Sequence, residues 1–479
     1  MPEAKTPVPR EVLERLRTAL GPAGYIDSPE GVAKYLTDFR ALYHGATPLV
    51  ACPHETAAVA TVLGICNEAG LGVVPCGGNT GYCGGATPSV RGDEIVLSLH
   101  RMNRIRAVDA VDFSLVAEAG CVLADVQAAA AAVDRLFPLS LGSEGSCQVG
   151  GNLSTNAGGL AALRYGVARE LVLGLEVVLP DGRVLAGLSN LRKDNTGYDL
   201  RDLFIGAEGT LGVITAASLK LWPLPRTIET AFFGVPDIEA AVQMLGRLRA
   251  DTGDAVTTFE YLPRIAVELT VRHIAGVTDP LGAPCPAYVL CEVSTARHDP
   301  ALRTLLEQSL AEGMERGLVR DATLAESLAQ RNALWKLRES VPEAQRHEGA
   351  SIKHDVSVPV AALPAFMREA RAAVERIAPD ARLVAYGHVG DGNLHFNLSE
   401  PAGGTGRDAF LAREQALHDA VHDCVAALGG SISAEHGIGQ LKRDALARYK
   451  DPVALEIMRA IKRALDPKGI MNPGKVLPG

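Results

Sequence analysis

Short clusters of glycine constrain this chain more than any other feature of its sequence. The chain has 479 residues and 49 glycines, many of which fall in three segments: PCGGNTG at 75–81, GSEGSCQVGGNLSTNAGG at 142–159 and GAEGTLG at 206–212. Glycine weakens the interior of helices and strands, so such clusters mark places where backbone approaches another group closely. Successive free N–H groups in a Gly-rich turn form a concave nest that suits a pyrophosphate. The pattern G-x-G-x-x-G is absent from the sequence, which argues against a Rossmann dinucleotide site.

Composition excludes several classes of protein. Apolar residues make up 47% and charged residues 22% of a chain long enough for two or three lobes. No run of 18 apolar residues occurs, so we expect no membrane span. The net charge of -9, scattered along the chain, makes nucleic acid a poor partner. Nine cysteines without a C-x-x-C pair favour reduced, structural thiols over an iron–sulfur cluster or a zinc ribbon. Because Glu3, Glu11 and Glu14 interrupt the first 20 residues, which resemble no targeting segment, we expect a cytoplasmic protein.

Apolar periodicity places the main elements. Helices are expected at 12–20, 54–70, 239–249, 301–316, 362–377, 409–428 and 453–465, and strands at 72–74, 94–99, 115–119, 171–179, 183–186, 211–222 and 287–293. Asp181-Gly182 predicts a type I′ hairpin turn. After Pro223 and Pro225 the sequence pattern changes from short strands with glycine turns to long helices and strands. We expect domains at 1–225 and 226–430, with 431–479 as a C-terminal segment that returns to the first domain.

Four segments carry a resemblance to a known superfamily. PCGGNTG (75–81), GGNLSTNAGG (150–159), GYDLRDLFIGAEGTLG (197–212) and NPGK (472–475) resemble the FAD-binding domain of the vanillyl-alcohol oxidase and p-cresol methylhydroxylase superfamily. The resemblance implies an α+β fold with a two-segment FAD-binding domain, an α+β cap domain over the flavin and a C-terminal helical segment. Members that link FAD covalently usually carry a histidine where Asn79 stands, so we expect non-covalent FAD. The residues implied to bind it are Pro75, Gly77, Gly78, Asn79, Thr80, Gly81, Gly142, Ser143, Ser146, Gly151, Asn152, Thr155, Asn156, Gly158, Glu208, Gly209, Ile214 and Asn472.

The segment GHVGDGNLHFNL at 387–398 has the pattern of a hairpin with a metal pair. Gly390, Asp391 and Gly392 are expected to form its turn, which would place His388 and His395 opposite each other. The period of two in a strand sends His395 and Asn397 to one face. Further on, Glu435 and His436 stand together in SAEHGIG at 433–439. Two histidines and a carboxylate form a catalytic zinc set or a non-haem iron set. The alternative is that they are hydrogen-bonded strand residues and a solvated loop.

These two segments resemble the GHxGDGNxH and EHGIG motifs of flavin-linked D-2-hydroxy-acid dehydrogenases. The resemblance implies that His388, His395 and Glu435 are metal ligands and that His436 is the catalytic base. Zn²⁺ is the first candidate, with Mn²⁺, Co²⁺ or Fe²⁺ as alternatives. A metal that binds the substrate hydroxyl lowers the pKa of that hydroxyl, a neutral histidine can take its proton, and the hydride passes to flavin N5. Asn397 is expected to hold the same end of the substrate.

Two cations suggest the kind of hydroxy acid. Arg338 and Lys353 stand at positions that resemble the pattern of D-2-hydroxyglutarate dehydrogenases, where they are implied to bind the distal carboxylate. A second carboxylate needs such a cation, whereas D-lactate would leave both cations desolvated and unpaired. Pro342 departs from the pattern of the animal members, which carry a threonine there. The preference for D-2-hydroxyglutarate over D-malate is therefore open.

Two other functions stay open beside this one. The chain could be a D-lactate or glycolate dehydrogenase of the same superfamily, or a non-catalytic flavoprotein subunit that relays electrons. A relay subunit has no need of paired histidines, a carboxylate and a base. The electron acceptor is expected to be an electron-transfer flavoprotein or a quinone. Metal identity, oxygen reactivity and oligomeric state are open, with a homodimer as the first candidate.

Overall fold

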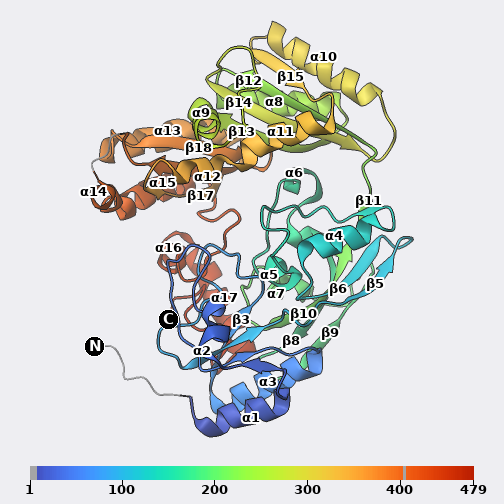
Figure 1. The fold of residues 1–479 in the computed structure, drawn as a ribbon, viewed down its shortest axis with the longest axis vertical. Helices are drawn as coiled ribbons and strands as arrows, with labels where there is room; N and C mark the ends of the chain where they lie inside the picture. Colours follow the sequence, from blue (N-terminus) through green and yellow to red (C-terminus); the bar gives the residue numbers. More distant parts are fainter. Residues whose placement is uncertain (1–7, 403–405, 479) are drawn as a thin grey trace. The chain divides into compact units, whose positions relative to one another are not determined.

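The computed structural model describes residues 8–402 and 406–478, and their contacts form two compact units (Figure 1). Unit 1 comprises Met1–Gly159, Gly166–Leu224 and Glu435–Gly479, and unit 2 comprises Leu160–Tyr165 and Pro225–Ala434. Both units combine helices with β-sheets, which confirms the expected α+β class. The domain limits expected at 225 and 430 stay predictions about folding units.

Unit 1 contains two main sheets. The first has the order β1-β2-β4-β3, with parallel pairing of β3 and β2 to β4, and the second has the antiparallel order β5-β6-β10-β8-β9. Strands β7 and β11 form a separate pair. The strands are β1 (Tyr25–Ile26), β2 (Val50–Ala51), β3 (Gly72–Cys76), β4 (Glu94–Ser98), β5 (Ile105–Asp109), β6 (Ser114–Glu118), β7 (Arg135–Leu136), β8 (Val172–Val178), β9 (Val184–Gly187), β10 (Val213–Lys220) and β11 (Trp222–Pro223).

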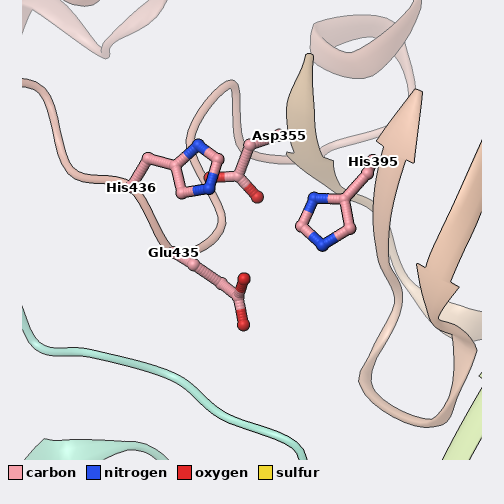
Figure 2. Close-up of side chains that lie close together, drawn as sticks. All are labelled: Asp355, His395, Glu435 and His436. Atoms are coloured by element: carbon pink, nitrogen blue, oxygen red, sulfur yellow. The ribbon is translucent and has the colours of Figure 1, made fainter. Parts of the chain in front are cut away.

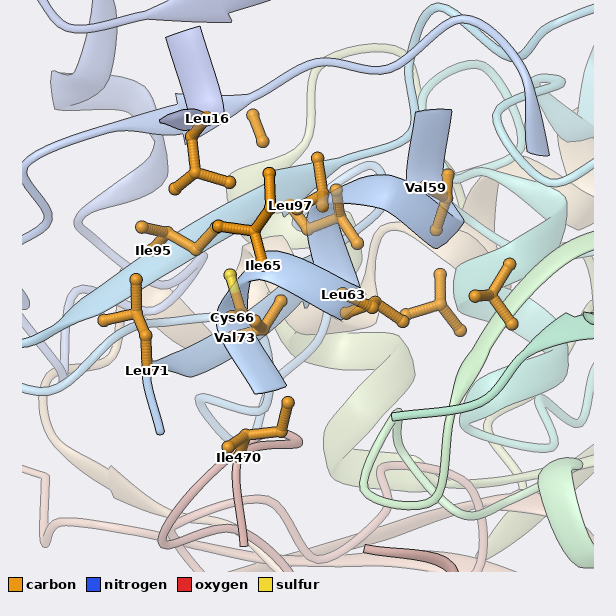
Figure 3. Packing of buried hydrophobic residues seen from close by; sticks show 14 of the residues in the cluster. Leu16, Val59, Leu63, Ile65, Cys66, Leu71, Val73, Ile95, Leu97 and Ile470 are labelled. Carbon is orange, nitrogen blue, oxygen red and sulfur yellow. The ribbon is translucent and has the colours of Figure 1, made fainter. Parts of the chain in front are cut away.

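Two helices pack with the first sheet to form a hydrophobic core of unit 1 (Figure 3). Leu16 of α1 and Val59, Leu63 and Cys66 of α3 pack with Val73, Ile95 and Leu97 of the strands. Ile470 and Met471 from the end of the chain join the same cluster. The helices of unit 1 are α1 (Arg10–Leu20), α2 (Pro29–Val32), α3 (Thr56–Ala69), α4 (Leu123–Ala131), α5 (Val149–Ser154), α7 (Arg201–Phe204), α16 (Arg443–Tyr449) and α17 (Pro452–Leu465), with 3-10 turns η1 (Ala33–Tyr35) and η2 (Ala168–Leu171).

The turn between β8 and β9 differs from the expected type I′. Gly182 has a positive φ of 84°, but Asp181 does not. The Gly182 N–H donates to the Leu179 carbonyl at 2.9 Å, so the four-residue turn is Leu179–Gly182. Its second residue is Pro180, whose ring fixes φ near -65° and cannot adopt the positive φ of a type I′ turn. The prediction of type I′ is therefore wrong.

Unit 2 is built on an eight-stranded sheet. The strand order is β15-β12-β14-β13-β18-β19-β16, and β17 also pairs with β19. The strands are β12 (Thr227–Val235), β13 (Val256–Pro263), β14 (Ala287–Thr295), β15 (Asp321–Leu324), β16 (Ser351–Ile352), β17 (Asp355–Ser357), β18 (Arg382–His388) and β19 (Asn393–Ser399).

Helices of unit 2 pack with the strands of this sheet in a hydrophobic core. Leu334 and Leu337 of α11 pack with Val267 of α9 and with Tyr288 and Tyr386 of the strands. The helix expected at 409–428 is two helices, separated at Ala412 and Arg413. The helices are α6 (Ala162–Tyr165), α8 (Ile238–Asp251), α9 (Arg264–His273), α10 (Ala301–Glu315), α11 (Leu328–Glu339), α12 (Val341–Arg346), α13 (Leu363–Ile377), α14 (Arg407–Leu411) and α15 (Glu414–Ala427), with 3-10 turns η3 (Val360–Ala362) and η4 (Val389–Asp391).

Among residues 8–402 and 406–478, no helix combines the length and the apolar character that crossing a membrane requires.

Candidate active site

A cavity in unit 1 gathers most of the glycine-rich segments, and we call it the glycine-lined cavity. It is bounded by the loop after β3, by helix α5, by residues 208–214 and by His436. Of the residues expected to bind FAD, those that line the cavity are Pro75, Gly77, Gly78, Asn79, Thr80, Gly81, Gly151, Asn152, Thr155, Glu208, Gly209 and Ile214. Segments far apart in the sequence thus meet around one space.

The walls of this cavity fit a large planar ligand that lies against backbone. A Cβ on Gly78 would lie 2.2 Å from the Ser146 carbonyl oxygen, so the loop and the segment before α5 meet without side chains. At Gly81 and Gly151 the place of a Cβ is open space. The buried Gln148 Oε1, which belongs to a lining residue, has no hydrogen-bond partner among the described residues. A ligand N–H donor would satisfy this acceptor, so the residues present fit FAD.

The other expected FAD residues have supporting positions. Asn156 Oδ1 accepts a hydrogen bond from the Arg169 N–H at 2.9 Å, and Ser146 Oγ donates to the Ser143 carbonyl. Asn472 Nδ2 donates to the carbonyls of Gly85 and Glu208 at 2.9 and 2.8 Å. The residues that do not line the cavity are Gly142, Ser143, Ser146, Asn156, Gly158 and Asn472.

Glu208 holds the loop that follows His436. Its two carboxylate oxygens accept hydrogen bonds from the N–H groups of Ile438 and Gly439 at 2.7 and 2.8 Å. Burial raises the pKa of the Glu208 carboxyl, although these two N–H groups favour its charged form. The ring of His436 meets the ring of Tyr82 edge-on, with centroids 4.6 Å apart. These contacts fix one side of the expected catalytic base.

In unit 2 the expected histidine hairpin forms between β18 and β19, but with a different register. His395 pairs with Tyr386, while His388 pairs with Glu260 of β13. The prediction that His388 and His395 stand opposite each other is therefore wrong. The reason is the turn: the Gly392 N–H donates to the Val389 carbonyl at 3.3 Å, so the turn spans four residues and its centre moves toward β18. The two rings still lie 5.6 Å apart, centroid to centroid.

Strand β17 brings a carboxylate to His395 from the other side. Asp355 pairs with His395 in the β17–β19 register, so the two side chains share a face of the sheet. Asp355 is buried, and its Oδ1 accepts a hydrogen bond from Asn393 Nδ2 at 3.0 Å. Beyond β17, Ser357 bridges to Ser431, and the Ala434 N–H donates to the Asp355 carbonyl at 3.2 Å. This pairing carries the chain to Glu435.

Four side chains converge at this point (Figure 2). Ligand atoms of Asp355, His395, Glu435 and His436 all lie within 4.8 Å of one another. Imidazole nitrogen and carboxylate oxygen are the donors that bind zinc and related divalent metals. The group therefore fits such an ion, and it contains the expected ligands His395 and Glu435, the expected base His436, and the additional carboxylate of Asp355.

The third expected ligand, His388, lies beside this group with one nitrogen engaged. Its Nδ1 is 2.6 Å from Glu260 Oε1. Metal-bound histidines commonly hold a carboxylate at the second ring nitrogen in this way. Glu260 Oε2 also accepts a hydrogen bond from Arg338 Nε at 2.7 Å.

The expected substrate residues come from three different elements of unit 2. Arg338 is buried near the end of α11, and Asn397 of β19 donates from Nδ2 to Gln345 Oε1 at 2.9 Å. Lys353 is half-buried in the link between β16 and β17, two residues before Asp355. Lys353 and Asn397 thus belong to the same part of the sheet as His395.

Sequence reasoning missed Asp355, Glu260 and Gln148. Asp355 was the easiest of the three to predict, because it stands in the same short segment as Lys353 and alternates with Val356 in a strand pattern. Glu260 lies in an apolar strand that periodicity did not indicate. Gln148 directly precedes α5 and had only its place within the 142–159 cluster as a signal.

Two family models cover most of this architecture. Residues 47–187 match an FAD binding domain, and residues 224–476 match the C-terminal domain of FAD linked oxidases. The chain belongs to the family of FAD-linked oxidases.

The chain is similar to curated proteins over most of its length. The chain is 42% identical over 462 residues to the mitochondrial D-2-hydroxyglutarate dehydrogenase of Danio rerio, covering 96% of this chain and 84% of the relative. It is 43% identical over 461 residues to the protein of the same name from Bos taurus, covering 95% and 82%. Among solved structures, p-cresol methylhydroxylase with substrate bound matches with a TM-score of 0.76 at 16% identity, covering 98% of this chain and 96% of that one. This last likeness shows the shared fold.

The comparison corrects the expected location. The relatives from Danio rerio and Bos taurus are both named as mitochondrial proteins. This contradicts the cytoplasmic location that we expected from the acidic residues near the N-terminus.

Proposed function

We propose that this protein is a dehydrogenase that oxidises D-2-hydroxyglutarate to 2-oxoglutarate with FAD as hydride acceptor. The observation that carries the proposal is the identity of 42% to a D-2-hydroxyglutarate dehydrogenase over 96% of the chain. The gathering of Asp355, His395, Glu435 and His436 supports it, because a relay subunit has no need of such a group. The relatives favour neither this relay role nor a D-lactate or glycolate dehydrogenase.

The glycine-lined cavity is the proposed FAD site, and the binding is non-covalent. FAD, when bound, supplies the hydride acceptor. The Asn79 side chain donates to the carbonyl of Thr37 at 3.0 Å and has no nucleophile. Gly81 and Gly151 leave room for the ligand, while Asn472 and Glu208 hold the surrounding backbone.

We further propose that His388, His395 and Glu435 bind a divalent metal, with Zn²⁺ as first candidate and Mn²⁺, Co²⁺ or Fe²⁺ as alternatives. The metal, when bound, supplies a Lewis acid for the substrate hydroxyl. Asp355 is buried next to His395 and adds negative charge that favours a cation. Zinc tolerates three or four ligands of this kind with one position left for substrate.

His436 is the proposed base. A neutral imidazole accepts the hydroxyl proton at physiological pH, and His436 lines the glycine-lined cavity, where the flavin is proposed to bind. Its ring packs edge-on against Tyr82, and Glu208 fixes the loop that follows it. Both contacts limit the motion of the ring, which keeps a base at a defined place.

Arg338 and Lys353 are proposed to bind the distal carboxylate, with Asn397 at the other end of the substrate. Two cations suit a second carboxylate on the substrate, because charge-assisted hydrogen bonds to a carboxylate are strong, so this arrangement favours a diacid over D-lactate. Pro342 supplies no hydroxyl donor where the animal members of the family have a threonine. D-Malate therefore stays a competing substrate. We also propose an electron-transfer flavoprotein or a quinone as the acceptor and a homodimer as the assembly.

Anaerobic reduction of the flavin tests this function directly. The FAD-loaded protein is mixed with D- and L-isomers of 2-hydroxyglutarate, malate and lactate, and the loss of flavin absorbance is followed. We expect D-2-hydroxyglutarate to bleach the flavin fastest and the L-isomers to leave it oxidised. Fastest bleaching by D-lactate would contradict the substrate, and no bleaching by any hydroxy acid would contradict the enzyme.

A further inference from the structure

A buried glutamate stands in a central strand of the unit 2 sheet. Glu260 lies in β13 between β14 and β18, and 1% of its side chain is exposed. One carboxylate oxygen is 2.6 Å from Nδ1 of His388, and the other accepts a hydrogen bond from Nε of Arg338 at 2.7 Å. A single carboxylate thus joins an expected metal ligand to an expected substrate-binding cation.

The negative charge of this carboxylate determines which nitrogen of the His388 ring carries the hydrogen. The guanidinium of Arg338 is always charged and forms an ion pair with Glu260 at 2.7 Å, and such a pair favours the ionised form of the carboxylate. An ionised carboxylate only accepts hydrogen bonds, so Nδ1 of His388 must carry the hydrogen. In the neutral ring the lone pair then sits on Nε2, the nitrogen that faces away from Glu260. This is the tautomer that a metal ligand at Nε2 requires.

Arg338 has a second contact that leads to the other histidine. Its guanidinium carbon lies 5.0 Å from the centre of the Tyr386 ring, and that ring lies 5.1 Å from the ring of His395. The orientation of Arg338 is therefore set by groups that also touch both histidines.

Stability alone is a weak reason for such a residue. Burying a charged pair costs a desolvation penalty that often cancels its attraction, and an apolar replacement is frequently no less stable. A second buried carboxylate on the same sheet, Glu292 of β14, provides a comparison, because it contacts helix α11 and does not contact the proposed metal ligand. It accepts hydrogen bonds from Arg331 Nη2 at 3.0 Å and Trp335 Nε1 at 2.8 Å, both on α11. Glu292 ties the same helix to the sheet without contacting His388.

We infer that Glu260 is a positioning residue that couples the metal ligand His388 to the substrate-binding Arg338, so that metal affinity and preference for a diacid depend on one side chain. The inference rests on the function proposed above, in which His388 binds metal and Arg338 binds the distal carboxylate. It adds a residue that touches neither substrate nor metal and yet controls both.

The test compares Glu260→Gln with the matched variant Glu292→Gln, both as full-length, FAD-loaded protein. Zinc affinity is measured on metal-stripped protein by competition with a chromophoric chelator, and kcat and KM are measured for D-2-hydroxyglutarate and D-lactate. We expect Glu260→Gln to bind zinc about 10- to 100-fold more weakly, the usual effect of losing such a partner. The ratio of kcat/KM for D-2-hydroxyglutarate to that for D-lactate should fall about tenfold or more as Arg338 loses its fixed position. Glu292→Gln should change neither quantity.

A further variant guards against misfolding. Glu260→Gln leaves Arg338 buried without its carboxylate, whereas Glu260→Gln combined with Arg338→Met removes both charges. This double variant should fold and still bind zinc weakly, because His388 has lost its carboxylate. Zinc affinity in both Glu260 variants equal to that of Glu292→Gln would overturn the inference while leaving the proposed function intact. A wild-type protein that binds no zinc or does not oxidise D-2-hydroxyglutarate would overturn the proposed function, and the inference with it.

Discussion

Lys353 occupies the short link between β16 and β17, two residues before Asp355, which pairs with His395. If it binds the distal carboxylate, Lys353→Met removes one charge-assisted hydrogen bond, which costs roughly 1.5–3 kcal/mol. That corresponds to a loss of about 10- to 150-fold in kcat/KM for D-2-hydroxyglutarate. D-Lactate has no group at this position and should lose far less. Steady-state kinetics with both substrates check this outcome.

A matched lysine provides the control for this substitution. Lys336 is exposed on α11 and donates to the Ala275 carbonyl at 2.8 Å, so Lys336→Met should leave both substrates unaffected. His436→Ala should behave differently again and lower kcat for every substrate, because it removes the proposed base. Equal losses for both substrates on Lys353→Met would show that Lys353 has a structural role.

The residues that could be predicted at this scale are those inside compact motifs. His395 and Glu435, from two separate motifs, and the adjacent His436 were expected together and lie together. Asp355 and Glu260 were not expected, because their roles depend on which strand pairs with which, and no local pattern encodes that. The offset of His388 has the same cause: one additional residue in the turn changes the partner of every residue in the strand.

At the scale of elements, one ion-pair network joins the start of a strand to the ends of two helices in unit 2. Glu348, just after α12, lies within bonding distance of Arg382 at the start of β18 and of His273 at the end of α9. Its hydrogen bonds to Arg382 and His273 hold the pKa of the Glu348 carboxyl down at about 2, well below its ordinary value of 4.5. The network thus stabilises these contacts only while the carboxyl is charged.

This network predicts that the free energy of unfolding decreases at acidic pH. A carboxyl with a depressed pKa in the folded state contributes stability that is fully present above pH 4.5 and is lost as pH falls toward the folded value. Glu348→Gln should therefore lower the free energy of unfolding at pH 7 by about 1–3 kcal/mol, and the difference from the wild type should shrink by pH 3. Urea unfolding followed by fluorescence at both pH values measures it. Glu343→Gln, an exposed change on α12, is the control, and a difference that stays constant with pH would contradict the assignment.

A helix with a clear end signal was predictable from the sequence. The helix at 54–70 ends as expected at Gly70, whose φ is 65°, and the observed α3 spans Thr56–Ala69. Strands β12 and β13 were missed, whereas β4 and β14, whose buried residues also run consecutively, were predicted. The β8–β9 turn was predicted from Asp181-Gly182 alone, although Pro180 before them excluded the type.

At the scale of the whole molecule, the FAD site depends on the complete unit 1 rather than on one segment. The glycine-lined cavity takes residues from 38 to 214 and His436 near the end of the chain. The resemblance of four short motifs predicted this fold, since their order along the chain is itself informative. The inclusion of Leu160–Tyr165 in unit 2 has no signal in the sequence, because it depends on contacts such as that of Arg164 with Ser294 Oγ at 3.1 Å.

Such a site predicts that FAD leaves when unit 1 unfolds. Asn79 holds the place of a linking histidine without a nucleophile, and burial raises the pKa of the neighbouring Cys76 to about 12, which makes its thiol unreactive. Heat or acid precipitation should therefore release all the flavin into the supernatant, as measured by absorbance. Flavin that stays with the pellet, with the mass of FAD added to the denatured chain, would show a covalent link.

The proposed metal, in contrast, should leave without unfolding and without loss of FAD. His436 lines the glycine-lined cavity and also belongs to the group with Asp355, His395 and Glu435. The proposed metal ligands are His388, His395 and Glu435, and none of them is among the described residues that line the cavity. A strong chelator should therefore abolish flavin reduction by D-2-hydroxyglutarate while the flavin spectrum of the protein persists. Added zinc should restore reduction, with manganese or cobalt as substitutes, because the donor set suits these ions. The same chelator saturated with zinc beforehand serves as control, since it removes no metal from the protein. Elemental analysis must accompany the kinetics: full activity in a preparation free of metal would show that His395 and Glu435 act without an ion.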